Sequence, residues 1–227
     1  MKISIHQPET YPQLGYFNKI YESEIFVFLD NANYRKNYFQ NRNRIQGKDG
    51  DIWLTLPVSG GKTILEKKYD VKFISKHIKT IQTVYGAGIV QEILSKLIVD
   101  VDRKAAGNLS EFNISFIKGI CELLGIGAQF LRSSSLNTAS AKSKLVLEIC
   151  EKTDAHIYLS GISGKEYLDL EEFKKAEIQL WYQIFKYPNY QQKGNGFNKY
   201  ASVVDCLCLN GVEKTAKFVK THEWEKA

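Results

Sequence analysis

The chain has 227 residues, 44% of them hydrophobic and 25% charged, which is enough to bury one sizeable core. No apolar run approaches the ~18–20 residues that cross a bilayer, and no signal sequence opens the chain. We therefore expect a cytoplasmic protein without membrane insertion. The net charge of +6 favours anionic small molecules such as nucleotides over nucleic acid, which usually requires a denser basic stripe.

The four cysteines argue against a metal site. Cys121 and Cys150 fall in helical apolar patterns, where a free thiol packs as a small hydrophobic side chain. Cys206 and Cys208 have neither a second cysteine pair nor a histidine at zinc-ligand spacing. We predict no metal ligands and, because the chain is expected in the cytoplasm, reduced thiols.

The first thirty residues predict a strand, a helix and a second strand. Residues 2–6 have strand composition and end abruptly before Pro8. Apolar residues at helical spacing follow between positions 14 and 21, and the continuous apolar run 25–29 is typical of a strand covered on both faces. This order is that of a βαβ unit.

The middle of the chain predicts mainly helices. Residues 31–50 are polar and predicted to be irregular, residues 52–56 return to strand composition, and residues 68–73 can add a strand. Three helices are expected, at about 75–85, 89–98 and 109–124.

Strands and helices alternate again in the second half. The predicted strands are 129–131, 156–159 and 178–185, and the predicted helices are 141–152, 171–176, a stretch 202–209 that ends at Gly211, and a final helix from there to about 219. This alternation predicts an α/β fold with a mainly parallel sheet and helices on both faces, a Rossmann-like three-layer sandwich. An additional helical segment is expected around 75–124. No linker divides the chain, so residues 1–227 are predicted to form a single domain.

Polar residues cluster beyond three of the predicted strands, at His6-Gln7, from Asp30 to Arg44, and from Ser160 to Asp169. In open parallel sheets, ligands bind beyond the carboxyl ends of the strands. The ligand site is therefore expected to open at the end of the first strand.

His6 is the first candidate for chemistry. A histidine at a strand end, followed by the rigid Pro8, can act as a general base or as a neutral hydrogen-bond partner near neutral pH. Alternatively, it only caps the turn. Gln7 can bind a substrate amide or hydroxyl through both its donor and its acceptor.

Residues 34–44 place four cations among aromatic side chains. The planar guanidinium groups of Arg42 and Arg44 suit bidentate binding of phosphate or carboxylate, and Lys36 and Asn41 add a cation and an amide. The interleaved aromatic rings can stack a base or a sugar. A solvated basic loop without a ligand is an equal alternative.

Two further groups come from the second half. Ser160 and Gly161 can form a backbone nest for an oxyanion, and Tyr167 and Asp169 add a hydroxyl and a carboxylate just downstream. Asp205 is a carboxylate within an apolar helix, and a buried acid must be paired or neutral. It is either a structural hydrogen-bonding residue, the preferred interpretation, or a tuned catalytic group.

Four sequence blocks, in order along nearly the whole chain, resemble the WbqC-like protein family. The first is His6-Gln-Pro-x-x-x-Pro12-x-x-Gly15-Tyr-Phe17. Thr10 and Gln13 depart from this block, in which the family often has aromatic residues. The remaining blocks are Asn41-Arg-Asn-Arg-Ile45 with Trp53-Leu-Thr-Leu-Pro-Val58, Tyr158-Leu-Ser-Gly161 with Tyr167-Leu-Asp169, and Ser202-Val-Val-Asp205 with Asn210-Gly211.

The resemblance implies a product of a polysaccharide or O-antigen gene cluster. For some members, transfer of glycine or another acyl group to an amino sugar has been proposed. The leading hypothesis is therefore a transferase that attaches an aminoacyl (glycyl) or acyl group to an amino sugar carried on a nucleotide. The expected partner is thus a small, anionic nucleotide sugar.

The residues of the blocks take roles in that hypothesis. His6 is expected to act as the base, Asp30 to orient His6 or the sugar hydroxyls, and Asp205 is the third catalytic candidate. Backbone amides of Ser160 and Gly161 are expected to face the oxyanion. The anionic part of the substrate is expected to bind Lys36, Arg42 and Arg44. The other substrate-binding candidates are Gln7, Gly15, Tyr16, Asn41, Tyr167 and Asp169.

Two alternatives stay open. A nucleotidyl- or ATP-dependent transferase is suggested by analogy with the opening of HxGH-type nucleotidyltransferases, although Tyr16 stands near the place of their second histidine. A non-catalytic sugar or nucleic-acid binding protein is permitted by the basic, aromatic residues 34–44. The sequence predicts no particular cofactor and no particular oligomeric state.

Overall fold

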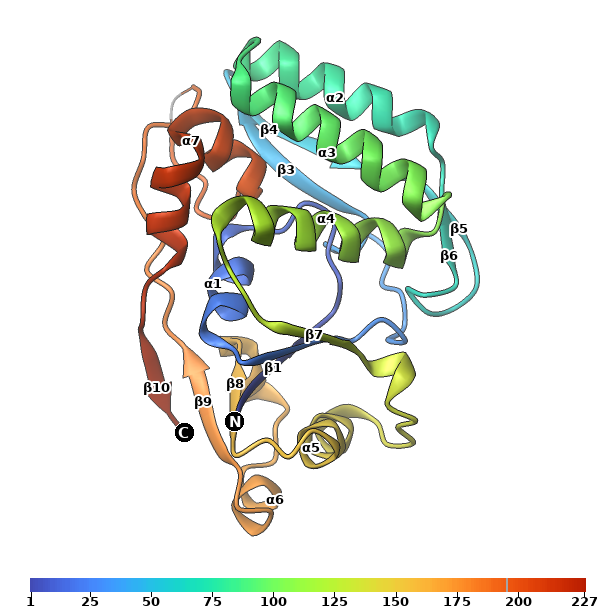
Figure 1. Ribbon diagram of the computed structural model, residues 1–227, viewed down its shortest axis with the longest axis vertical. Coiled ribbons are helices and arrows are strands. Elements are labelled where there is room, and N and C mark those ends of the chain that lie inside the picture. The colour runs from blue at the N-terminus through green and yellow to red at the C-terminus, as the bar shows by residue number, and fades with distance from the viewer. Residues whose placement is uncertain (195) are drawn as a thin grey trace.

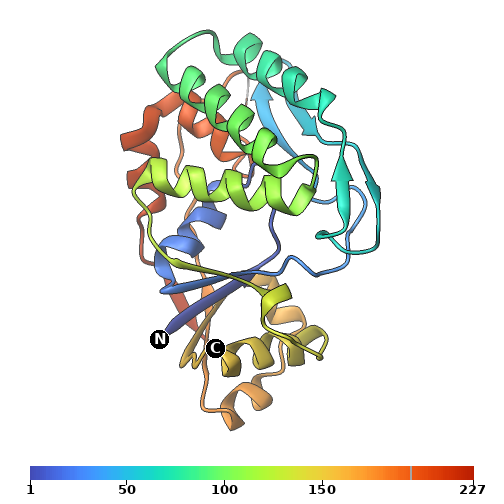
Figure 2. The ribbon, with the colours of Figure 1, turned by 45° about the vertical axis from the view of Figure 1, so that its right-hand side comes forward.

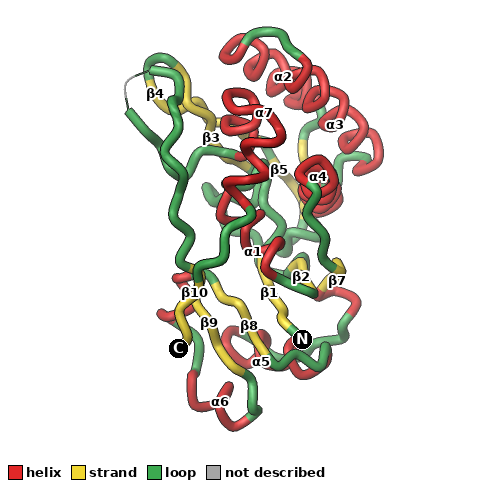
Figure 3. The backbone as a smooth tube through the Cα atoms, turned by 60° about the vertical axis from the view of Figure 1, so that its left-hand side comes forward, coloured by secondary structure: helices red, strands yellow, loops and turns green. Residues whose placement is uncertain are grey.

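The computed structural model describes residues 1–194 and 196–227. Its main feature is a six-stranded sheet in the order β10-β9-β8-β1-β2-β7, whose strands lie side by side in Figure 3. Among the described strands of this sheet, only the edge strand β10 runs antiparallel to its neighbour. The predicted α/β class and mainly parallel sheet are therefore confirmed. The strands are β1 (Lys2–His6), β2 (Ile25–Phe28), β7 (Gln129–Arg132), β8 (Ile157–Ser160), β9 (Gln179–Gln183) and β10 (Trp224–Lys226).

The predicted helices are present near their expected positions. Within the described residues there are seven α-helices, and α2 to α4 form the expected additional helical segment, at the top of Figure 1. No helix in this part of the chain is long and apolar enough to cross a membrane. The helices are α1 (Leu14–Glu22), α2 (Lys72–Tyr85), α3 (Ile89–Ala105), α4 (Leu109–Leu124), α5 (Lys142–Lys152), α6 (Leu170–Lys175) and α7 (Val203–Val219), with 3-10 turns η1 (Ser133–Ser135) and η2 (Ile162–Glu166).

The segment 31–50, predicted to be irregular, differs from that prediction because it contains a strand. Arg42 and Arg44 are half-buried and alternate with buried residues. The polar Asn43 interrupts the alternation of polar and apolar residues by which a strand is predicted, because it occupies a buried position. Its amide donates to the backbone oxygen of Tyr11 (2.9 Å) instead of facing water. The strand forms an antiparallel ribbon of β3 (Arg42–Gly47) and β4 (Gly50–Thr55).

A second small antiparallel sheet follows the β3–β4 ribbon. The strand predicted at 68–73 is wrong in its second half, because α2 begins at Lys72. Its first half pairs with a segment that the sequence does not predict as a strand. The pair consists of β5 (Val58–Gly60) and β6 (Lys67–Tyr69).

Each face of the main sheet carries its own hydrophobic cluster. Ile3 and Ile5 of β1 belong to the cluster that includes α5 and α6, so Ser4 and His6 alternate to the face of α1. In Figure 2, α5 and α6 lie below the sheet, and α1 and α4 lie above it. The finer comparison with a Rossmann-like three-layer sandwich stays a prediction.

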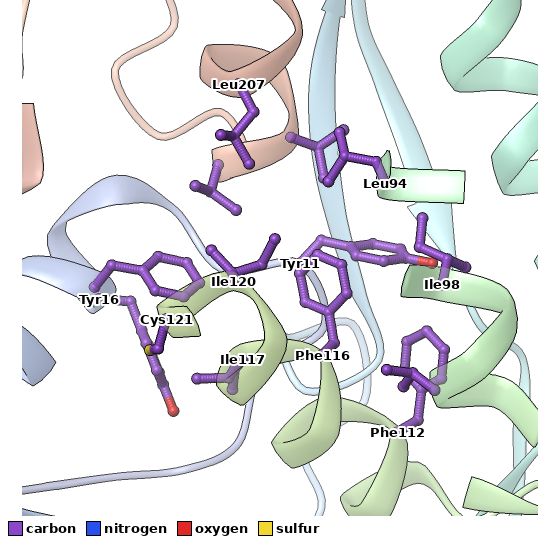
Figure 4. Packing of buried hydrophobic residues seen from close by; sticks show 14 of the residues in the cluster. Tyr11, Tyr16, Leu94, Ile98, Phe112, Phe116, Ile117, Ile120, Cys121 and Leu207 are labelled. Atoms are coloured by element: carbon purple, nitrogen blue, oxygen red, sulfur yellow. The ribbon is translucent and has the colours of Figure 1, made fainter. Parts of the chain in front are cut away.

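Tyr11 anchors the loop between β1 and α1 in the larger cluster. Its ring is fully buried against Phe112 and Phe116 of α4, with ring centroids 5.9 and 4.9 Å away (Figure 4). The backbone of Tyr11 has a φ of 51°, a left-handed conformation that is unfavourable for a residue with a side chain. Packing of the ring therefore holds the loop in one conformation over the end of β1.

Candidate functional site

The carboxyl ends of β8, β1 and β2 meet at one edge of the sheet, because these strands are adjacent and parallel. The chain leaves β1 through α1 toward β2, and it leaves β8 through α6 toward β9 on the opposite side. Diverging connections of this kind mark the topological switch point at which ligands bind in open α/β sheets. His6 and Ser160, as the last residues of β1 and β8, both lie at this point.

His6 faces α1 and lacks a hydrogen-bond partner for Nδ1. Its ring packs edge-on against Tyr16, with ring centroids 4.8 Å apart. Nδ1 is buried without a partner among the described residues and lies 3.9 Å from Oε1 of Glu9, while 34% of the side chain stays exposed. Burial, and then the charge of Lys19, hold the pKa of His6 well below its ordinary value. The imidazole is therefore neutral at pH 7 and can accept a proton.

Two buried charged residues lie next to His6, and the sequence analysis missed both. Glu9 is 8% exposed and Lys19 is 5% exposed. Within residues 1–194 and 196–227, the Lys19 ammonium makes no hydrogen bond or ion pair, and the Glu9 carboxylate has only the 3.9 Å contact with His6. We call His6, Glu9 and Lys19 the His6 cluster.

Both buried charges of the His6 cluster titrate near neutral pH. Burial raises the pKa of Glu9 to about 7 and lowers the pKa of Lys19 to about 8, while each charge opposes the shift of the other. Groups with such pKa values are suited to general acid–base chemistry. A sequence signal existed, since Glu9 follows His-Gln-Pro directly and Lys19 is the lone cation of α1.

Gly161, just after β8, lies beside Lys19. A Cβ atom on Gly161 would lie 3.3 Å from Nζ of Lys19, so the glycine leaves the space that the ammonium uses. The Ser160 side chain lies on the other face of the sheet, because it alternates with Leu159 and shares the side of Tyr158. The structure therefore brings Gly161 to the His6 cluster and turns the Ser160 hydroxyl away from it.

Three of the predicted binding residues fix the loop around the His6 cluster. The Tyr16 hydroxyl donates to the backbone oxygen of Gln7 (3.0 Å), and Oε1 of Gln7 accepts from Nε2 of the buried Gln40 (2.7 Å). The backbone N–H of Gly15 donates to Oε1 of Gln13, the N-cap of α1. Direct contact of Gln7, Gly15 and Tyr16 with a substrate stays a prediction.

Asp30 is buried beyond β2, and its hydrogen bonds lead to the end of β7. Its carboxylate accepts from the Ser133 hydroxyl (3.0 Å) and from the backbone N–H (3.0 Å) and hydroxyl (2.7 Å) of Ser134. No hydrogen bond or ion pair joins Asp30 to His6 in the described part of the chain. Asp30 therefore ties two strand ends together here, and its catalytic role stays a prediction.

Asp205 lies in the first turn of α7 and is fully buried. Its carboxylate accepts from the backbone N–H of Gln46 (3.1 Å), the Tyr190 hydroxyl (2.8 Å), Nε2 of Gln192 (2.9 Å) and the Tyr85 hydroxyl. We call these five residues the Asp205 network. A carboxylate with four donors is well satisfied, which supports the structural interpretation over the catalytic one.

Arg42 and Arg44 lie on the outer face of β3 beside Trp53. Their guanidinium carbons are 4.3 and 5.3 Å from the centroid of the Trp53 ring, which favours cation–π attraction. Arg42 also donates to the backbone oxygen of Asn37 (2.8 Å), and Arg44 pairs with Asp51 (2.8 Å). Both cations are thus oriented, and part of their hydrogen-bonding capacity is already in use.

The remaining predicted site residues lie in separate places. Lys36 and Tyr167 are exposed, Asn41 is buried and donates to Leu56, and Asp169 accepts from the backbone at the start of α6. Within the described residues, none of these four makes a hydrogen bond or ion pair with the His6 cluster. No group of three or more His, Cys, Asp or Glu side chains in that part of the chain is arranged to hold a metal ion.

Similarity to known proteins shows which family the chain belongs to. A model of the WbqC-like protein family matches residues 7–217. The chain belongs to the WbqC-like protein family. This WbqC-like chain is 28% identical over 219 residues to Uncharacterized protein Rv1507c of Mycobacterium tuberculosis, with 93% of the chain and 95% of the relative covered. No solved structure matches the chain significantly. The matched region contains Glu9, Lys19 and Gly161.

Proposed function

We propose that this WbqC-like protein transfers an aminoacyl or acyl group to an amino sugar, with the His6 cluster as its reaction centre. The supporting observation is that Glu9 and Lys19 are buried beside a neutral His6 without compensating partners among the described residues. Burying an unpaired charge costs several kcal/mol. Buried charged side chains without partners at a topological switch point are suited to bind the charged groups of a substrate.

The proposed reaction needs three groups, and the His6 cluster offers one for each. The amino nitrogen of the sugar attacks the acyl carbonyl, an N–C bond forms, and the bond to the leaving group breaks. Neutral His6 takes the proton that the nitrogen loses and returns it to the leaving group. The Lys19 ammonium, beside Gly161, stabilises the tetrahedral oxyanion. Before attack, the Glu9 carboxylate binds the ammonium form of the amino sugar and takes one of its protons, which leaves the neutral amine that attacks.

The substrate is proposed to be an anionic nucleotide sugar. Arg42, Arg44 and Lys36 are the candidates to hold its diphosphate, and the positive net charge of the chain favours such a ligand. The proposed setting is cytoplasmic synthesis of surface polysaccharide or O-antigen, as the family resemblance implies. The nucleotidyltransferase alternative has less support, because the Tyr16 hydroxyl is engaged with the backbone of Gln7.

The test uses purified protein, uridine-diphosphate-linked amino sugars, and acetyl or glycyl thioesters, with mass spectrometry of the sugar product. His6→Gln is expected to lower kcat by about 100-fold or more, as for the loss of a general base. His156→Gln, at an exposed histidine just before β8, is the matched control and should keep the wild-type kcat. Equal turnover of wild type and His6→Gln would contradict the proposal. Pyrophosphate release from ATP that depends on His6 would support the nucleotidyltransferase alternative instead.

A further inference from the structure

A hollow of about 530 Å³ lies on the outer face of the β3–β4 ribbon, and none of the His6 cluster residues lines it. The loop that leads into α7 passes beside this ribbon (Figure 3). The volume falls in the range of small-molecule sites, roughly 300–1,000 Å³. Its side-chain lining comes from Arg44, Gln46 and Asp51 of the ribbon and from Phe197, Asn198, Lys199 and Tyr200 of the loop.

Asp51 is held in place as an acceptor in this hollow. Its Oδ2 accepts from Nη1 of Arg44 (2.8 Å), and its Oδ1 accepts from Nδ2 of Asn198 (2.6 Å). Asn198 is fixed in turn, since its backbone N–H donates to Oε1 of Gln192 (2.6 Å). Each carboxylate oxygen has two lone pairs, so both can accept a further hydrogen bond from a ligand. The orientation of Asp51 before binding reduces the ordering that binding requires.

Gln46 adds an amide that the protein leaves largely without partners. It is 7% exposed and lines the hollow, and its Nε2 has only a 3.5 Å contact with the backbone oxygen of Gly47. Its Oε1 accepts no hydrogen bond within residues 1–194 and 196–227. The bond from Gln46 to Asp205 uses the backbone N–H, so the side chain is not needed for the Asp205 network. A buried amide with open donor and acceptor indicates a ligand that carries hydroxyl groups.

Aromatic rings form the other wall of the hollow. Phe197 and Tyr200 are 42% and 44% exposed, which is a large apolar area for two neighbouring loop residues. Aromatic faces of this kind stack against sugar rings or bases. Charge argues against a bare anion as the ligand, because the Arg44 guanidinium is already paired with the Asp51 carboxylate. Lys199 remains as a cation at the edge, 5.0 Å from the Tyr200 ring.

We infer that this hollow binds a sugar ring with adjacent hydroxyl groups, either the ribose of a nucleotide or a pyranose. The diol donates to Asp51 and Gln46, and the ring stacks on Tyr200 or Phe197. Arg44 orients Asp51 through Nη1, and among the described residues its other N–H groups stay free for the diphosphate of the proposed substrate. Binding here goes beyond the proposed function, because it occurs whether or not a group is transferred.

Isothermal titration calorimetry with the full chain tests this binding with four probes: UMP, dUMP, N-acetylglucosamine and inorganic phosphate. A ribose site binds UMP and loses about tenfold in affinity for dUMP, which lacks the 2′-hydroxyl that the acceptors bind. A pyranose site binds N-acetylglucosamine more tightly than UMP. Equal affinity for UMP and dUMP with no binding of N-acetylglucosamine overturns the inference. Two other results would also overturn the inference. One is phosphate binding as tight as that of UMP, and the other is no binding of any probe at a concentration of about 10 mM.

Substitutions in the hollow test the assigned residues. Asp51→Asn, Gln46→Met and Tyr200→Ala are each expected to weaken binding of the best probe by about tenfold, by loss of a hydrogen bond or of stacking. Asp100→Asn and Ile89→Ala, both at exposed positions on α3, are the controls and should bind like wild type. Thermal melting of each variant checks that it is folded.

Unchanged affinity in all three hollow variants would overturn the inference. Lys19→Met, which removes a group that the proposed transfer needs, should bind the probe with wild-type affinity. Loss of turnover and loss of sugar binding are therefore separable, so that either proposal can fail without the other.

Discussion

The Asp205 network and the His6 cluster both bury charged side chains, but only the first supplies partners for them. Four donors surround the Asp205 carboxylate, whereas Glu9 and Lys19 have no hydrogen bond among the described residues. A satisfied buried carboxylate holds elements together, while an unsatisfied buried charge lowers stability and is retained where a ligand uses it. Burial alone does not identify a catalytic acid in this fold; the hydrogen bonds that surround it do.

Replacement of Asp205 should give the largest change in stability. Asp205→Ala leaves the hydroxyls of Tyr85 and Tyr190 and the backbone N–H of Gln46 without their acceptor, so the free energy of unfolding should fall by about 3–5 kcal/mol. Urea denaturation measures the loss, and Asp100→Ala at an exposed position on α3 is the control. A loss below about 1 kcal/mol would show that Asp205 is not a structural residue and would remove the contrast with the His6 cluster.

The pH dependence of stability should reveal Glu9. Its pKa in the folded protein is about 7, above the ordinary value of 4.5, so its contribution to stability is present below pH 4.5 and is lost as the pH rises through 7. The loss from this group is at most about 3 kcal/mol. Glu9→Gln should remove that slope when urea unfolding is compared with wild type at several pH values. Parallel curves for the two proteins would show that Glu9 is ionised and paired in the folded state.

Lys19 should give the opposite pH dependence of stability, and at higher pH than Glu9. Its pKa is lowered to about 8 from 10.5, so its contribution to stability is present above pH 10.5 and is lost as the pH falls through 8. At pH 7, Lys19→Met should therefore leave the free energy of unfolding unchanged or raise it by about 1 kcal/mol. Lys104→Met, at an exposed position on α3, is the control for the charge change. A loss of more than about 2 kcal/mol in Lys19→Met would show that the ammonium has a structural partner.

Much of the fold could be predicted from hydrophobic periodicity. The strand–helix–strand opening, the helices of residues 75–124 and the later alternation all appear near their predicted positions. The strand β3 was missed because Asn43 is a polar residue at a buried position, satisfied by the backbone of Tyr11. A single sequence does not contain the information that such a distant acceptor will be present.

The location of the candidate site was predicted better than the residues that form it. His6 and Gly161 were expected together because each follows a predicted parallel strand. Glu9 and Lys19 were missed, since a glutamate in a turn and a lysine in a short helix are usually exposed. Asp30 and His6 also follow adjacent strands, yet the serines at the end of β7 take the Asp30 carboxylate.

Hydrophobic spacing and short motifs in the sequence specified most of the order of strands and helices, the family blocks, and the placement of His6 at the end of the first strand. These properties are local, because they depend on spacing along the chain and on the residue types at each position. The tertiary structure alone decided which buried charges are paired. It surrounded Asp205 with donors from three other segments and left Glu9 and Lys19 without any in the described chain. That difference depends on contacts between residues far apart in sequence, and it separates a structural carboxylate from a candidate reaction centre.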